Sequence, residues 1–295
     1  MQPHNRCHWL LAAAVATLVS HAAAQANGPC DGRTPAFILA GDSTTAVQSA
    51  LGGGWGTGFL SFLKPPGWGS NHGRNGATTA SFVDDGEWER VIQQVKDSKA
   101  AYDCIVTIQF GHNDQIPSRG VSQQQYRDNL ENFAQQVKDA GGTPHEATDT
   151  LANERRLSMA AAAATQTRFL DLNAASMAYI EAIGATAAHR LDSKPGDTEH
   201  VGDHGSVVFG RMVADLLLGH EAVVGGASAA EDEDDDNSFA TYDDDAYGGV
   251  LVKQSPDLQG VDGGFDGPAP LPECLKQWFN EDKELSDKIW SGIEA

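Results

Sequence analysis

Two apolar runs in the first half of the chain each end abruptly in polar residues. Residues 37–40 (FILA) run into Gly-Asp-Ser, and residues 102–110 (YDCIVTIQF) run into Gly-His-Asn-Asp. Continuous apolar runs of this length are typical of parallel strands that are buried on both faces. Because open α/β sheets bind ligands at the carboxyl ends of their strands, we expect Ser43 and Asn113 to lie at that edge.

Helices are indicated between and after these strands by apolar residues spaced three and four apart. Ser122 and Gln125 form a capping box at the start of one helix, and Gly141 ends it. The predicted helices comprise residues 87–98, 122–140, 151–165, 174–183 and 207–218. Residues 168–172 regain strand character. Alternating strands and helices predict an α/β fold built on a parallel sheet.

Residues 143–150 (TPHEATDT) interrupt this alternation. They separate two predicted helices at a point where a doubly wound fold requires a strand, yet they contain no apolar run. The central sheet is therefore expected to be one strand short near residues 143–150, unless a piece of chain has been lost there.

The two ends of the chain differ in composition from its middle. Residues 1–24 combine basic residues, a short apolar run and small residues, the layout of a secretory signal peptide, so we expect a secreted, extracellular protein. Residues 25–222 are the predicted folded domain. Residues 223–270 contain acidic runs that predict a disordered linker. Residues 271–295 regain tryptophan, phenylalanine and leucine and are expected to form one helix.

The net charge and the cysteine content limit the classes of partner and the redox compartment that we expect for this protein. The formal net charge is −21 and is concentrated after residue 225, which argues against a nucleic-acid partner. No segment after the signal is apolar enough to anchor the chain in a membrane. Cys30, Cys104 and Cys274 would remain after signal cleavage, which permits one disulfide and leaves the pairing open.

Residue types suited to acyl transfer occur at the predicted loop positions. A serine hydroxyl such as that of Ser43 becomes a nucleophile when an imidazole accepts its proton and a carboxylate orients that imidazole. Asp197 and His200 share an irregular segment and can approach each other without help from the fold. The N–H groups of Ser43 and Gly73 and the amide of Asn113 suit an oxyanion hole. Taken singly, each of these residues also suits a turn or a surface position, and for Ser43 and Gly73 a simple turn is the commoner role.

Taken together, four short blocks resemble the SGNH, or GDSL, hydrolase superfamily. The blocks are Gly41-Asp42-Ser43, Asn71–Asn75, Gly111–Asp114 and Asp197–His200, in the order that the family has them. Within it, the chain is most similar to the secreted rhamnogalacturonan acetylesterases. The resemblance implies a flavodoxin-like three-layer α/β/α fold with a central parallel sheet. It also implies that Ser43 is the nucleophile, His200 the base, Asp197 its orienting partner, and Ser43, Gly73 and Asn113 the oxyanion hole.

The function that this resemblance implies is removal of acetyl groups from the pectic polysaccharide of plant cell walls. Such an enzyme is a secreted, monomeric carboxylic ester hydrolase with no metal or organic cofactor and no nucleic-acid or membrane partner. Two alternatives remain open: an esterase for acetylxylan or small esters with the same triad, and a catalytically impaired carbohydrate-binding homologue. Relatives carry a further strand and a long loop near Pro144, and they lack the acidic tail.

An acidic protein and an anionic pectin repel each other. Binding is therefore expected to depend on local cationic groups, such as Arg74 or Arg119. Arg74 lies in the second of the four blocks, and Arg119 follows the third.

Overall fold

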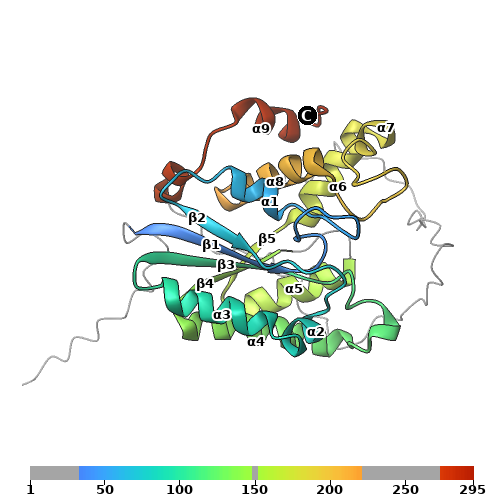
Figure 1. Ribbon diagram of the computed structural model, residues 1–295. Helices are drawn as coiled ribbons and strands as arrows, with labels where there is room; N and C mark the ends of the chain where they lie inside the picture. The colour runs from blue at the N-terminus through green and yellow to red at the C-terminus, as the bar shows by residue number, and fades with distance from the viewer. Residues whose placement is uncertain (1–32, 148–151, 221–272) are drawn as a thin grey trace, which may run out of the picture.

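The computed structural model describes residues 33–147, 152–220 and 273–295. The predicted signal peptide (1–24) and the predicted acidic linker (223–270) lie outside these described residues. A five-stranded sheet forms the middle of the fold, with helices on both faces (Figure 1). Its strands are β1 (Thr34–Gly41), β2 (Trp68–Asn71), β3 (Tyr102–Gln109), β4 (Thr143–Ala147) and β5 (Arg168–Leu170).

Every strand pair in this sheet is parallel, and the strand order is β2-β1-β3-β4-β5. β1 and β3 pair over their full length, from Thr34 opposite Tyr102 to Gly41 opposite Gln109. Both strands are interior and covered on each face, which explains their continuous apolar sequences. The three-layer α/β/α fold with a central parallel sheet is therefore confirmed.

Two hydrophobic cores lie on opposite faces of the sheet, because successive side chains of a strand point to opposite sides. Phe37 and Leu39 of β1 enter one core, and Ile38 and Ala40 enter the other. The layer over the first core contains α1 (Gly56–Ser61), α6 (Leu172–Ile183), α7 (Ala185–Ala188) and α8 (Asp203–Leu217). The layer over the second contains α2 (Thr79–Asp84), α3 (Glu87–Ser98), α4 (Gln123–Ala140) and α5 (Ala152–Ala164).

The expectation that the sheet is one strand short near residues 143–150 is wrong. β4 lies between β3 and β5, with Thr107 opposite His145 and His145 opposite Arg168. The strand is buried without being apolar, since His145 is only 2 % exposed. Burial lowers the pKa of His145 to about 3, with help from the nearby Arg168 charge, so the imidazole is neutral in the interior. Because Pro144 and His145 take the place of apolar residues, no apolar run marks this strand in the sequence.

The C-terminal residues contribute to the first core. Residues 273–295 form a 3-10 helix, η3 (Glu273–Trp278), and a helix, α9 (Lys283–Trp290), in place of the single helix expected over 271–295. Phe279 lies between them and is 1 % exposed. Its ring centroid lies 5.6 Å from that of Phe37 in β1 and 5.7 Å from that of Phe59 in α1. The folded unit therefore extends past residue 222 and includes this segment.

Cys104 of β3 is buried and unpaired within the described part of the chain, and burial raises the pKa of its thiol. The side chains of Cys30 and Cys274 lie outside the described residues, so a pairing between these two stays open. Among the helices described, none has both the length and the apolar character that crossing a bilayer requires.

Candidate active site

Ser43 lies in a tight turn directly after β1, at the carboxyl edge of the sheet. The carboxylate of Asp42 shapes this turn by accepting hydrogen bonds from the N–H (2.9 Å) and the hydroxyl (2.8 Å) of Thr44. The N–H of Asp42 donates to the carbonyl of Gln109, the last residue of β3, at 3.2 Å. Ser43 itself forms no hydrogen bond within the described residues, so its hydroxyl and N–H remain available.

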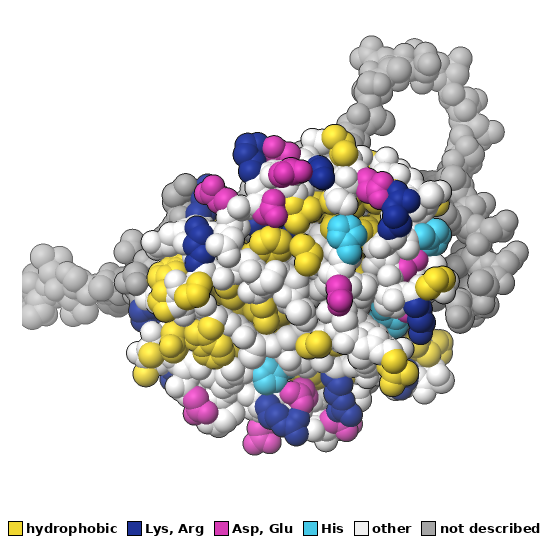
Figure 2. Space-filling model, turned by 45° about the horizontal axis from the view of Figure 1, so that its top comes forward, with side chains coloured by type: hydrophobic (Ala, Val, Ile, Leu, Met, Phe, Trp, Pro, Cys, Tyr) yellow, Lys and Arg dark blue, Asp and Glu magenta, His cyan; other side chains and the backbone are white. Residues whose placement is uncertain are grey.

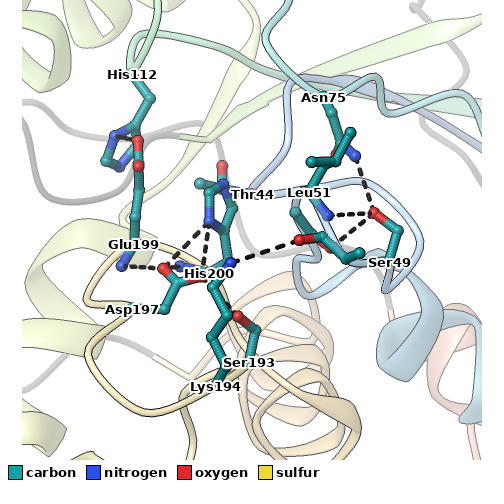
Figure 3. A network of polar contacts seen from close by, with 12 residues as sticks. Thr44, Ser49, Leu51, Asn75, His112, Ser193, Lys194, Asp197, Glu199 and His200 are labelled. Carbon is teal, nitrogen blue, oxygen red and sulfur yellow. Dashed lines mark hydrogen bonds and ion pairs between the residues drawn. The ribbon is translucent and has the colours of Figure 1, made fainter.

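Asp197 and His200 lie in the loop between α7 and α8 and contact each other (Figure 3). His200 Nδ1 lies 3.2 Å from both carboxylate oxygens of Asp197. Ser193 Oγ donates to Asp197 Oδ2 at 2.6 Å, and the N–H groups of Glu199 and His200 donate to Oδ1 at 3.1 and 3.0 Å. Burial opposes ionisation, but these hydrogen bonds outweigh it and hold the pKa of Asp197 well below its usual range. A charged carboxylate therefore orients the imidazole and leaves Nε2 to accept a proton.

A pair of glycines brings the loop of His200 to the turn of Ser43. The carbonyl of Gly53 accepts a hydrogen bond from the N–H of Val201 at 2.9 Å. A Cβ added to the neighbouring Gly52 would lie 3.0 Å from Ser43 Cβ, so this close approach needs glycine. Ser43 and His200 therefore lie on either side of a two-residue segment, although no hydrogen bond joins their side chains among the described contacts.

The two remaining oxyanion donors implied by the sequence differ in availability. Asn113 follows β3 and is 8 % exposed, and its Nδ2 has no hydrogen-bond partner among the described residues. A buried donor without a partner is costly to keep, which points to a ligand that binds there. Gly73 follows β2, but its N–H donates to Asn71 Oδ1 at 2.8 Å. Asn113 is thus ready to bind an oxyanion, whereas the N–H of Gly73 would first have to leave Asn71.

An ion pair joins the loop of Asn113 to the loop of the base. His112 Nδ1 lies 2.8 Å from Glu199 Oε1 (Figure 3). The hydrogen bond to His112 lowers the pKa of Glu199 and outweighs the opposing effect of burial. Because His112 precedes Asn113 and Glu199 precedes His200, this contact sets the distance between the amide donor and the imidazole.

A cavity of about 370 Å³ lies beside the imidazole. Its walls include Thr44, next to Ser43, and the loop of His200, together with residues of α6 and α7. Apolar side chains such as Trp55 and Ile180 make up much of the lining. The site therefore combines a polar edge that can carry out chemistry with an adjacent apolar space.

Three residues that shape the site were not predicted from the sequence. Ser193 donates to Asp197, and Glu199, which lies inside the Asp197–His200 block, pairs with His112. Nothing in the pattern of an irregular loop marks either role. Gln109 lies beneath the Ser43 turn, where its Oε1 accepts hydrogen bonds from Trp55 Nε1 at 2.7 Å and from the hydroxyl of Thr45. A polar residue near the end of an apolar run was the available signal for Gln109.

The arrangement contains the parts that acyl transfer to a serine requires. Ser43 supplies a hydroxyl without a competing partner, the Asp197–His200 pair supplies an oriented base, and Asn113 supplies a donor for the oxyanion. Within the described ranges, no group of three His, Cys, Asp or Glu side chains is placed to hold a metal ion.

Known proteins share sequence and fold with this chain. Rhamnogalacturonan acetylesterase RhgT of Bacillus subtilis (strain 168) is 31 % identical over 110 residues, which cover 36 % of this chain and 45 % of RhgT. The chain therefore spans less than half the length of this curated relative.

Solved structures also resemble this chain. The Bacillus subtilis protein YXIM matches with a TM-score of 0.55 at 22 % identity, over 63 % of this chain and 56 % of that one, which shows a common fold. A catalytic mutant of Axe2, an acetylxylan esterase from Geobacillus stearothermophilus, matches with a TM-score of 0.47 at 22 % identity, over 65 % of this chain and 96 % of that one.

Residues 37–189 match the family of GDSL-like lipases/acylhydrolases. The matched segment begins within β1 and includes Ser43, Gly73 and Asn113, and it ends before Asp197 and His200. Just over half of the chain lies within the match. The chain therefore belongs to the GDSL-like lipase/acylhydrolase family.

Proposed function

We propose that this protein is a serine carboxylic ester hydrolase that releases acetyl groups from acetylated pectic polysaccharide. The observation that carries the proposal is the Asp197–His200 pair, which the Gly52–Gly53 segment separates from a Ser43 without a competing hydrogen bond among the described residues. Membership of an acylhydrolase family supports the reaction type. The identity of 31 % to a protein named rhamnogalacturonan acetylesterase supports the substrate.

The first half of the reaction forms an acyl-enzyme. Ser43 Oγ attacks the acetyl carbonyl carbon while His200 Nε2 accepts the hydroxyl proton, and Asp197 stabilises the resulting imidazolium. The carbonyl oxygen becomes an oxyanion that the Asn113 amide and the N–H of Ser43 bind. Collapse of this intermediate breaks the bond to the sugar oxygen, which leaves as an alcohol with the proton from His200.

The second half of the reaction regenerates the enzyme. Water attacks the acetyl group on Ser43 while His200 accepts one of its protons, and the same donors bind the second oxyanion. When this intermediate collapses, Ser43 Oγ leaves with the proton from His200 and acetate is released. Each step moves one proton between His200 Nε2 and an oxygen of Ser43, the sugar or water. Water is the only co-substrate that the mechanism requires.

The place of action is also part of the proposal. A predicted signal peptide at residues 1–24 supports a secreted, extracellular enzyme. We propose that it acts as a monomer on plant cell-wall polysaccharide.

Acetate release tests the proposal directly. Wild-type enzyme and Ser43→Ala are compared on acetylated rhamnogalacturonan, on acetylxylan and on p-nitrophenyl acetate. The proposal predicts a higher kcat/KM on the pectic polymer than on xylan, and no release by Ser43→Ala. A preference for xylan would reassign the substrate, and failure of the wild-type enzyme on all three would favour the impaired carbohydrate-binding homologue.

A second candidate function is hydrolysis of small apolar esters, which the cavity beside His200 favours. Its volume of about 370 Å³ exceeds the needs of an acetyl group, and its lining includes Leu172 and Phe209. A series of p-nitrophenyl esters from acetate to octanoate separates the two functions. A maximum of kcat/KM at acetate supports the acetylesterase, and a rise with chain length supports the alternative.

A further inference from the structure

Arg119 is an exposed cation in the loop that follows Asn113. It ends the 3-10 helix η1 (Pro117–Arg119), in the loop that carries Asn113. Its guanidinium is exposed and forms no hydrogen bond or ion pair among the described residues. Arg119 Nη2 lies 3.9 Å from the position that a Cβ on Gly76 would occupy, so the guanidinium faces the loop after β2.

Lys194 is a second exposed cation near the candidate site. It belongs to the loop of the Asp197–His200 pair, and its side chain is exposed. Its Nζ lies 3.5 Å from the carbonyl oxygen of Ala50 (Figure 3). No carboxylate of the described residues lies within ion-pair distance of this ammonium group.

A row of contacting residues, here called the strip, runs from Arg119 to Lys194 and passes Ser43. It consists of Asn75, Gly76 and residues 49–52. Asn75, the neighbour of Gly76, donates from Nδ2 to Ser49 Oγ at 3.0 Å (Figure 3). Ser49 is bonded across a tight turn to the carbonyl of Gly52, and Ala50 of the same turn contacts Lys194. A Cβ on Gly52 would lie 2.4 Å from Asn75 Oδ1 and 3.0 Å from Ser43 Cβ. The proposed nucleophile thus lies beside the middle of the strip.

Nearby carboxylates are occupied by other partners. Asp85 forms an ion pair with Arg74, so Arg74 is less available to a substrate than Arg119. Glu199 is paired with His112. On the face drawn in Figure 2, acidic and basic side chains likewise lie next to one another rather than in patches of one sign. Arg119 and Lys194 therefore retain positive charge that no described carboxylate neutralises.

We propose that Arg119 and Lys194 bind carboxylates of an anionic, uronate-containing polysaccharide on either side of the acetylated sugar at Ser43. This rests on the proposed esterase function and names the residues that would favour an acidic over a neutral polymer. A formal net charge of −21 repels such a polymer, so local cations must offset that repulsion. Each exposed contact is weak and sensitive to salt, but two contacts on one polymer chain reinforce each other.

The ratio of activity on acidic and neutral polymers tests the proposal. Arg119→Gln, Lys194→Gln and the double variant are assayed for kcat/KM on acetylated rhamnogalacturonan and on acetylxylan. The ratio of the two values should fall by about threefold for each substitution and by about tenfold for both. Lys96→Gln is the matched control, because this exposed lysine lies near the end of α3, at the opposite edge of the sheet. An unchanged ratio in the double variant overturns the proposal.

Binding without turnover separates this proposal from the esterase function. De-esterified polygalacturonate carries carboxylates but no acetyl groups, so its Kd does not depend on catalysis. Calorimetric titration should give a Kd about tenfold higher for the double variant than for the wild-type protein. The wild-type affinity should also fall as NaCl is raised from about 20 to about 200 mM. Equal Kd values for the two proteins would refute the role of these cations, whatever the acetate assays show.

Discussion

The amides of Asn71 and Asn113 lie at the ends of β2 and β3, the two strands that flank β1. Asn71 is fully engaged: its Nδ2 donates to the carbonyl of Thr45 and its Oδ1 accepts from Gly73, both at 2.8 Å. Asn113 Nδ2 is buried and has no partner among the described residues. Asn71 therefore stabilises the turn that carries Ser43, whereas the amide of Asn113 is available to a ligand.

Asn113→Ala should lower kcat by about 10²–10³-fold, because it removes a donor to the oxyanion. Its melting temperature should stay close to the wild-type value, since no hydrogen bond within the described structure involves Nδ2. Asn71→Ala is the matched control and should lower the free energy of unfolding by about 1–2 kcal/mol, because it removes two hydrogen bonds. Steady-state kinetics and calorimetry measure both effects. Full activity in Asn113→Ala would exclude this residue from the oxyanion hole.

Sequence reasoning located the residues that follow a strand better than those that act through an irregular loop. Ser43 and Asn113 were predicted to share an edge because apolar runs precede both, and parallel strands place such positions together. The contact of Ser193 with Asp197 depends on how residues 193–201 fold back on themselves, and the contact of Glu199 depends on where His112 lies in the fold. The local pattern of apolar and polar residues does not predict the path of this loop, so the roles of these two residues are known only from the structure.

Among the elements, β4 shows that a buried strand need not be an apolar run. Main-chain pairing with β3 and β5 holds it in the sheet, and this pairing requires no apolar side chains, although Pro144 has no N–H to contribute. Neither ring nitrogen of its buried His145 has a hydrogen-bond partner within the described residues. The folded state must therefore keep this imidazole uncharged, which couples stability to pH.

Acidification should destabilise the protein through His145. Its pKa in the folded state is about 3, below the ordinary value of 6.5, so only the unfolded chain gains this proton between the two pH values. The contribution of the neutral His145 to the free energy of unfolding is fully present above about pH 6.5 and is lost as the pH falls towards 3. Between about pH 7.5 and about pH 5 the loss amounts to about 2 kcal/mol. Denaturant unfolding of wild type and His145→Val at both pH values measures it. The valine variant should lose less stability at low pH, and an identical loss would contradict this account.

At the scale of the whole molecule, the C-terminal segment completes the core on one face of the sheet. The buried Asp215 of α8 accepts hydrogen bonds from Ser286 Oγ and Trp290 Nε1, both at 2.8 Å, and Phe279 packs against β1. Composition alone predicted a helix at residues 271–295 without indicating a docking surface. Contacts between segments so distant in sequence are set by the tertiary fold and leave little trace in local periodicity.

Phe279→Ala should lower the free energy of unfolding by about 3–5 kcal/mol, because it opens a cavity among aromatic rings beneath β1. Ile293→Ala is the control from the same segment. Ile293 is 56 % exposed, so its truncation should change stability by no more than about 0.5 kcal/mol. Denaturant titration compares the two. Equal effects would mean that this segment adds nothing to the stability of the core.

Identification of the acylated residue tests the central claim most directly. Wild-type enzyme is mixed with p-nitrophenyl acetate, quenched in acid during turnover, digested and examined by mass spectrometry. We predict an acetyl group on the peptide that contains Ser43, and a loss of esterase activity in Ser43→Ala of about 10⁴-fold or more. An acetyl group on another residue, or a Ser43→Ala enzyme that still releases acetate at close to the wild-type rate, would contradict the mechanism.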